Sequence, residues 1–163
     1  MRWVSLRDGE RGERAGVLVE GAVHAAEPGI RLLDLLAAGD LAEVGTRLLE
    51  QPDAVVREWD RADMMSPVPR PPSVRDFYAF EQHVRTARQR RGLEMDPDWY
   101  QLPVFYFSNP VAVKGPYQDV AVPPGSSQLD FELEVAAVVG RGGADLQPDQ
   151  AEEHIAGFCV MND

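Results

Sequence analysis

Three acidic residues, Asp130, Glu132 and Glu134, alternate with apolar residues in the segment LDFELEVAAVV at 129–139. This alternation predicts a strand over 129–139, in which successive side chains point to opposite faces and the three carboxylates share one face. The Cα atoms of Glu132 and Glu134 would be about 6.6 Å apart, close enough for both carboxylates to bind one hard divalent cation. The ordinary alternative is a solvated strand face, because Glu-Leu-Glu alone is weakly specific.

Asp76 and His83 form a second pair, seven residues apart in SVRDFYAFEQHVRTARQRRG at 73–92. On a continuous helix they would lie on one face, two turns apart, where either could serve a site. The ordinary alternatives are a capping box formed by Ser73 and Asp76, and a partly exposed histidine among charged neighbours. Asp163 could likewise be no more than a terminal polar residue.

Several other chemistries are excluded by missing motifs. The sequence has no G-x-S-x-G elbow, no H-E-x-x-H pair and no P-loop, and its glycines at 140, 142 and 143 lack the dinucleotide-binding pattern. Cys159 lies in an apolar segment, where a buried thiol is usually inert. His24 and His154 are interpreted as structural residues.

Composition restricts the partners. The 163 residues hold 16 Lys plus Arg against 27 Asp plus Glu, a net charge of −11, and Lys114 is the one lysine. This balance argues against nucleic-acid binding, which needs a basic face. The longest uncharged apolar run, 155–161, is far shorter than the ~20 residues of a membrane helix, and the first residues lack a signal-peptide pattern. We therefore expect a soluble cytoplasmic protein without a membrane partner and, with one cysteine, without an internal disulfide.

The expected elements follow hydrophobic periodicity and turn signals. Four prolines between Pro67 and Pro72 mark the best boundary. The sequence thus predicts a small N-terminal accessory domain over 1–66 and a second domain over 67–163. The expected strands are 2–6, 15–25, 102–106, 111–114, 129–139 and a buried strand at 155–161; the expected helices are two in 28–51 broken at Gly39-Asp40, one over at least 78–90, and a short one starting at Pro148.

Four stretches together resemble the fumarylacetoacetate hydrolase family. They are PVPRPPSVRDFYAFEQH (67–83), DWYQLPVFYFSNP (98–110), GSSQLDFELEVAAVVGR (125–141) and AEEHIAGFCVMND (151–163). They follow the family order and cover most of 67–163, whereas the first 66 residues match only in character. The resemblance implies an α+β, mostly β fold: a small β-rich N-terminal domain, then the first part of a mixed β-sandwich roll.

The resemblance also implies roles for particular residues. His83 would be the general base, and Tyr78 and Tyr106 would contact substrate. The family uses an arginine after the helix, for which Arg90 and Arg91 fit equally and Arg91 is taken. The metal ligands would be four carboxylates: Asp76, Glu132, Glu134 and Asp163.

The implied activity is hydrolysis of a carbon–carbon bond in a 1,3-diketo or 2-oxo acid such as an acylpyruvate. The implied cofactor is Mg²⁺, with Ca²⁺ and Mn²⁺ as alternatives, and the implied assembly is a homodimer of the full-length protein. A decarboxylase or isomerase of the same family is one alternative, and an inactive fragment acting as a binding or assembly module is another. Because the family continues well past MND, we expect a truncated member that is inactive or poorly folded alone.

Overall fold

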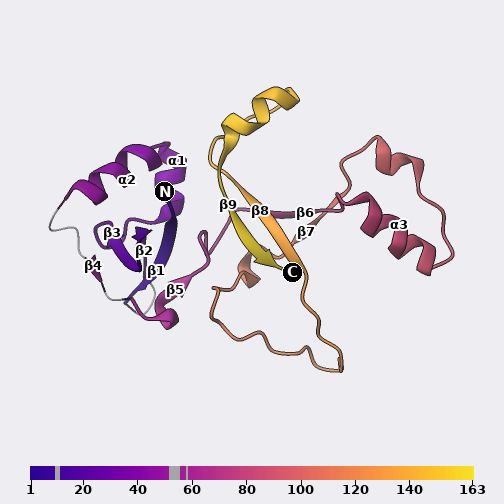
Figure 1. Ribbon diagram of the computed structural model, residues 1–163, viewed down its shortest axis with the longest axis horizontal. Helices are drawn as coiled ribbons and strands as arrows, with labels where there is room; N and C mark the ends of the chain where they lie inside the picture. The colour runs from indigo at the N-terminus through magenta and orange to yellow at the C-terminus, as the bar shows by residue number, and fades with distance from the viewer. Residues whose placement is uncertain (10–11, 52–55, 58) are drawn as a thin grey trace. The chain divides into compact units, whose positions relative to one another are not determined.

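The computed structural model describes residues 1–9, 12–51, 56–57 and 59–163. They fall into two compact units, one of residues 1–69 with 114–163 and one of residues 70–113. The architecture is mixed α+β, with most regular structure in strands of small sheets, as expected (Figure 1). No helix among these residues has the length and apolar character needed to cross a membrane.

The first unit begins with an antiparallel meander of β1 (Trp3–Asp8), β2 (Gly12–Val19) and β3 (Ala22–Ala25). Two short strands, β4 (Val56–Arg57) and β5 (Met64–Met65), extend it to the order β4-β3-β2-β1-β5. The meander confirms the strands expected near 2–6 and 15–25, with a turn at residues 20–21 dividing the second of them.

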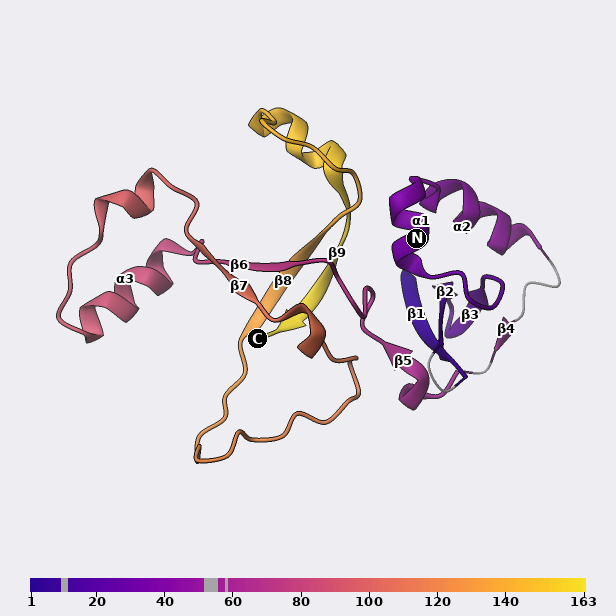
Figure 2. The same ribbon diagram turned by 180° about the vertical axis from the view of Figure 1, so that it is seen from behind.

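Two helices, α1 (Leu32–Ala38) and α2 (Leu41–Glu50), pack on one face of this sheet (Figures 1 and 2). They confirm the two helices expected in 28–51. Gly39 ends α1 in the left-handed conformation at φ 78°, and its N–H donates to the carbonyls of Leu35 and Leu36. Buried side chains of the two helices pack against Ala15 and Val17 of β2.

A long antiparallel hairpin closes the first unit, drawn in orange and yellow in Figure 1. It pairs β8 (Leu133–Val139) with β9 (Ile155–Asn162), and the 3₁₀ helix η4 (Pro148–His154) leads into β9. The strand predicted at 129–139 therefore starts later, at Leu133. The prediction of a buried strand at 155–161 is wrong in one respect: its residues alternate between half-buried and exposed, and Phe158 and Val160 are 69% and 76% exposed.

The second unit pairs β6 (Val74–Phe77) with β7 (Phe105–Ser108), and helix α3 (Glu81–Arg90) lies in the connection that joins the end of β6 to the start of β7 (Figure 2). Two 3₁₀ helices complete it, η2 (Pro97–Tyr100) and η3 (Pro110–Ala112). Val84 of α3 is its buried apolar anchor, 1% exposed.

Three expectations for this region are wrong. The helix starts at Glu81 rather than 78, and no capping box forms at Ser73, because residues 74–77 pair with residues 105–108 as a strand. Segment 111–114 is not a strand, since Pro110 begins a 3₁₀ turn there. Pairing with a distant strand outweighed the local helix signal. The division into a domain of residues 1–66 and a domain of residues 67–163 stays a prediction.

Candidate active site

Two of the predicted carboxylates meet at the open end of the β8 to β9 hairpin. Glu134 and Asp163 each place a carboxylate oxygen within 4.8 Å of the other. The register explains this approach: Glu134 lies opposite Met161, so the chain end after β9 returns beside the start of β8. Two acidic groups at this separation can share one cation.

Glu134 does not lie on a solvated outer face. It is half-buried, whereas its apolar neighbours Leu133 and Val135 are 75% and 74% exposed. The alternation predicted for the strand is therefore present, but its more covered side is the acidic one. This argues against the ordinary interpretation of a solvated carboxylate face.

Glu132 and Asp130 precede β8 instead of belonging to it. The backbone of Glu132 is bound twice: its carbonyl accepts from the N–H of Asp163 at 3.1 Å, and its N–H donates to Oδ1 of Asn162 at 2.9 Å. Asp130 accepts the N–H of Phe131. Glu132 is thus tied beside Asp163 by its backbone, while its carboxylate is not part of the converging pair.

Asn162 is a residue that sequence reasoning missed. The available signal was its place directly before Asp163 in MND, opposite the Glu-Leu-Glu segment, but only the register of the hairpin shows that the two meet.

In the second unit, Asp76 lies on the β6 to β7 ribbon directly opposite Tyr106. Side chains of directly opposed residues share one face of a two-stranded ribbon, so this carboxylate and this phenol are neighbours. Asp76 is half-buried and Tyr106 is 55% exposed. The prediction that Asp76 and His83 share one helical face is wrong, since Asp76 is in β6 and His83 in α3.

Tyr78 and His83 contact one another between the strand and the helix. Their rings meet edge to face, with centroids 5.8 Å apart and planes at 87°. The backbone of Tyr78 is held on both sides, because its N–H donates to the Val104 carbonyl at 3.0 Å and its carbonyl accepts Nε1–H of Trp99 at 2.7 Å. The general base predicted from the resemblance is therefore exposed but set against a fixed tyrosine.

His83 and Arg90 both line a shallow hollow on α3. They are seven residues apart and therefore lie on the same face of the helix. Arg91 does not line this hollow; its Nε–H donates to the carbonyl of Ala87 at 3.1 Å near the end of the helix. Of the two arginines that the sequence left open, Arg90 is the one beside His83. The other residues of the hollow are Phe80, Gln82, Thr86 and Ala87.

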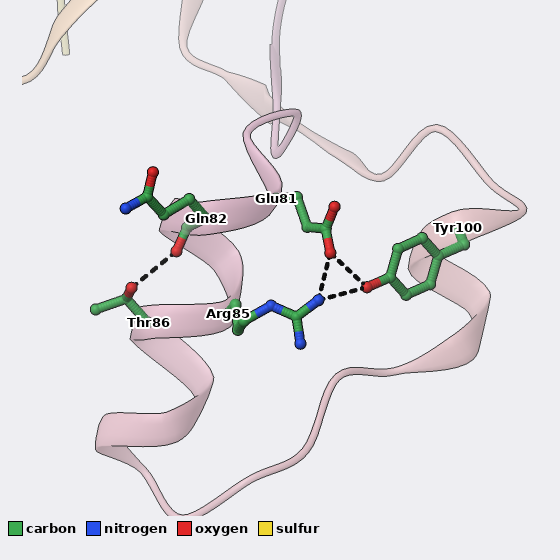
Figure 3. Close-up of polar contacts among 5 residues, drawn as sticks. All are labelled: Glu81, Gln82, Arg85, Thr86 and Tyr100. Atoms are coloured by element: carbon green, nitrogen blue, oxygen red, sulfur yellow. Dashed lines mark hydrogen bonds and ion pairs between the residues drawn. The ribbon is translucent and has the colours of Figure 1, made fainter.

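A three-residue polar cluster joins the start of α3 to η2 (Figure 3). The hydroxyl of Tyr100 donates to Glu81 at 2.8 Å, and Arg85 donates both to this hydroxyl at 3.0 Å and to Glu81. The Tyr100 hydroxyl, with Arg85 beside it, lowers the pKa of Glu81 below its usual value, and the Glu81 carboxylate raises the pKa of Tyr100. The cluster, which the sequence did not predict, ties the loop after α3 back onto the helix that carries His83.

Three residues that the sequence analysis assigned no chemical role, His24, His154 and Cys159, lie outside the clusters described above. His24 is in β3, and Nδ1 of His154 lies 3.0 Å from the Arg141 carbonyl at the turn of the hairpin. Cys159 is half-buried in β9, and burial raises the pKa of its thiol, which disfavours the reactive thiolate.

Residues 73–163 match the family model described as the C-terminal domain of fumarylacetoacetate hydrolase. This is more than half of the chain, which therefore belongs to the fumarylacetoacetate hydrolase family, as the four sequence stretches predicted. The match includes both the carboxylate pair of the hairpin and the Tyr78 to His83 contact.

Curated relatives include both hydrolases and tautomerases. A fumarylacetoacetase of Oryza sativa subsp. japonica is 36% identical over 108 residues, which are 54% of this chain and 25% of that protein. A mitochondrial oxaloacetate tautomerase of Homo sapiens is 36% identical over 61 residues, 37% of this chain and 19% of that protein. The chain thus matches a quarter or less of the length of these relatives.

Solved structures share the fold over nearly the whole chain. The fumarylacetoacetate hydrolase of psychrophilic Exiguobacterium antarcticum superposes with a TM-score of 0.66 at 24% identity, covering 100% of this chain and 55% of that one. A protein of Mycobacterium smegmatis superposes with a TM-score of 0.72 at 25% identity, covering 99% of this chain and 54% of that one. The expected α+β, mostly β fold of the family is thereby confirmed.

Proposed function

We propose that this chain belongs to a divalent-cation-dependent hydrolase that cleaves a carbon–carbon bond in a 1,3-diketo acid, such as an acylpyruvate or a fumarylacetoacetate-like acid. The observation that carries the proposal is the approach of Glu134 and Asp163 within the region that matches the family model. A fumarylacetoacetase relative that is 36% identical over 108 residues supports the reaction class.

The carboxylate pair meets the geometric requirement of the cation. Two oxygens that each lie about 2.3 to 2.6 Å from one Ca²⁺ are at most about 5 Å apart, and the Glu134 and Asp163 oxygens lie within 4.8 Å. We assign these two as ligands, and Glu132 and Asp76 as the further carboxylates of the set. Mg²⁺ is the ion that the family resemblance implies, and Ca²⁺ and Mn²⁺ are alternatives, because oxygen donors suit all three ions.

A cation held by these carboxylates would supply Lewis-acid polarisation of the substrate carbonyl. His83, in its neutral form, accepts a proton from water, and that water attacks the carbonyl carbon. The carbon–carbon bond then breaks, its electron pair leaves with the departing enolate, and the proton held by His83 passes to that carbon. Tyr78 orients the His83 ring through the edge-to-face contact. Tyr106 donates a hydrogen bond to the substrate, and an arginine of α3 binds its carboxylate.

The arginine assignment needs a direct test. Arg91 was expected from the resemblance, and Arg90 lines the hollow beside His83. We propose that Arg90 carries the role, so Arg90→Gln should weaken binding of a 2-oxo acid more than Arg91→Gln does. The reverse order would return the role to Arg91.

The experiment that tests the metal centre is calorimetric titration of the chain with Mg²⁺, Ca²⁺ and Mn²⁺. We expect Glu134→Gln and Asp163→Asn each to weaken binding by at least about tenfold, because each removes one charged ligand. Glu43→Gln is the matched control, since Glu43 is an exposed glutamate of α2 paired with Arg47. Affinity in Glu134→Gln and Asp163→Asn as high as in the Glu43→Gln control would contradict the proposal and favour a binding or assembly module.

Keto–enol isomerisation of a 2-oxo acid is the second candidate, and the match to an oxaloacetate tautomerase favours it. The two reactions differ in their products, because hydrolysis consumes water and yields two acids, whereas isomerisation keeps one molecule intact. Nuclear magnetic resonance of an acylpyruvate incubated with the protein separates them: two new acids identify hydrolysis, and faster keto–enol exchange alone identifies the isomerase.

A homodimer of the full-length protein is proposed on the same family basis. Analytical ultracentrifugation of the protein tests it, with a single monomeric species as the contrary result.

A further inference from the structure

At the open end of the β8 to β9 hairpin, hydrogen bonds between the two segments continue past the last paired residues of the strands. The regular ladder ends with Leu133 opposite Asn162, and the N–H of Asp163 then donates to the Glu132 carbonyl at 3.1 Å. Beyond that bond, Oδ1 of Asn162 accepts the N–H of Glu132 at 2.9 Å. A side-chain amide thus takes the place of a backbone carbonyl at the end of the ladder.

This side-chain hydrogen bond holds the segment that carries the acidic residues. Without the Asn162 side chain, one hydrogen bond, donated by the N–H of Asp163, would hold the Glu132 backbone to the opposite segment. With it, both polar backbone groups of Glu132 are bound to residues 162 and 163. Asparagine suits the position because its short side chain offers the same acceptor as a backbone carbonyl.

We propose that Asn162 is a positioning residue that holds Glu132 beside Asp163 and thereby strengthens divalent-cation binding at this end of the hairpin. The affinity part rests on the proposed function. Asn162 acts through Glu132 and is not itself a ligand, because its acceptor oxygen is directed at the Glu132 backbone. Groups of this kind, which fix the orientation of metal ligands, commonly affect metal affinity.

Three variants separate this role from general stability. Asn162→Ala removes the acceptor, and Asn162→Asp keeps an acceptor oxygen at the same position. Gln150→Ala is the matched control, since Oε1 of Gln150 accepts the backbone N–H of Gln147 at 3.0 Å in η4, at the other end of the hairpin.

The first measurement is hydrogen exchange of the Glu132 amide in the metal-free protein. We expect exchange about tenfold faster in Asn162→Ala and close to the parent rate in Asn162→Asp and Gln150→Ala, because a lost hydrogen bond exposes that amide. The second is Mn²⁺ titration, in which Asn162→Ala should bind about 10-fold to 100-fold more weakly than the parent, and Asn162→Asp should not.

Unchanged Glu132 exchange in Asn162→Ala would overturn the anchoring, and parent-like Mn²⁺ affinity in that variant would overturn its effect on the cation. Equal loss in the alanine and aspartate variants would also overturn the proposal, since the retained acceptor would then have no value. A parent protein that binds no cation would instead overturn the proposed function together with the affinity part, while the exchange result would still decide whether Asn162 holds Glu132.

Discussion

At the residue scale, short-range contacts determine the positions of candidate site residues that come from distant parts of the sequence. Glu134 and Asp163 meet because an antiparallel hairpin returns the chain on itself. Tyr78 lies against His83 because Trp99 and Val104 hold its backbone. In both places the chemistry-bearing group is exposed or half-buried, while the groups that position it are bound by hydrogen bonds.

The cluster of Glu81, Arg85 and Tyr100 makes a prediction about pH. The hydroxyl of Tyr100 is the largest cause of the lowered pKa of Glu81, so Tyr100→Phe should raise that pKa toward its usual value of 4.5. Titration of the Glu81 carboxyl carbon by nuclear magnetic resonance measures the change. Tyr117→Phe, in the other unit, is the control and should leave the pKa of Glu81 unchanged.

The sign of the stability effect follows from this lowered pKa. The ionised form of Glu81 is favoured in the folded protein, so the contact between α3 and η2 contributes fully above pH 4.5. Its contribution is lost as pH falls below 4.5 through the lowered pKa. In Tyr100→Phe this acid-sensitive contribution should be smaller, and an identical acid dependence in parent and variant would contradict the assignment.

At the element scale, two helices covering a sheet face build the larger core of the first unit. Leu32, Leu35 and Leu36 of α1 and Leu48 of α2 are each less than 10% exposed, and they pack on the β2 face. The short turn at Gly39 and Asp40 allows both helices to reach the same face. The hairpin is different, because its own strands leave large apolar side chains exposed.

Gly39→Ala tests the turn between the helices. The φ of 78° at Gly39 is in the left-handed region, where a Cβ costs about 1 kcal/mol, although no atom lies within 4 Å of the added carbon. Urea denaturation should show this loss of unfolding free energy. Gly142→Ala is the control, with open space and no left-handed φ; an equal loss there would exclude backbone strain as the cause.

At the scale of the whole molecule, an acidic chain is expected to depend on cations for stability. The net charge of −11 adds self-repulsion, and the hairpin brings two of the 27 acidic residues within 4.8 Å. A cation that binds the folded state alone shifts the folding equilibrium toward that state.

Thermal unfolding with and without Mg²⁺ measures this linkage. Free Mg²⁺ at about 100 times its dissociation constant adds about 2.7 kcal/mol to folded-state stability, so the Tm should rise. NaCl at matched ionic strength is the control for general screening, which acts on all surface charges. The Glu134→Gln variant should keep the NaCl effect and lose the additional Mg²⁺ effect; an equal Mg²⁺ rise in that variant would place the stabilising ion elsewhere.

The sequence was most informative where local pattern and tertiary environment agree. The β-meander, the two helices in 28–51 and the strand alternation around Glu134 were all predicted from spacing alone. These signals are local: turn residues, 3.6-residue periodicity and strand alternation act within a few residues of one another.

The local signals were misleading where distant pairing decided the structure. Ser73 and Asp76 favour the start of a helix. Residues 74–77 instead pair with β7 in a two-stranded ribbon, and Asp76 lies opposite Tyr106. No local pattern specifies that partner, because its strand begins nearly thirty residues later.

The sequence by itself therefore determined the family, the residue types of the candidate site and most of the elements, since motifs and periodicity are properties of short segments. Only the tertiary structure decided which of those residues meet. The approach of Glu134 to Asp163, the hold of Asn162 on Glu132 and the place of Arg90 beside His83 depend on strand register and helix phase. A shift of one residue in either would turn these side chains away, because neighbouring residues point in different directions.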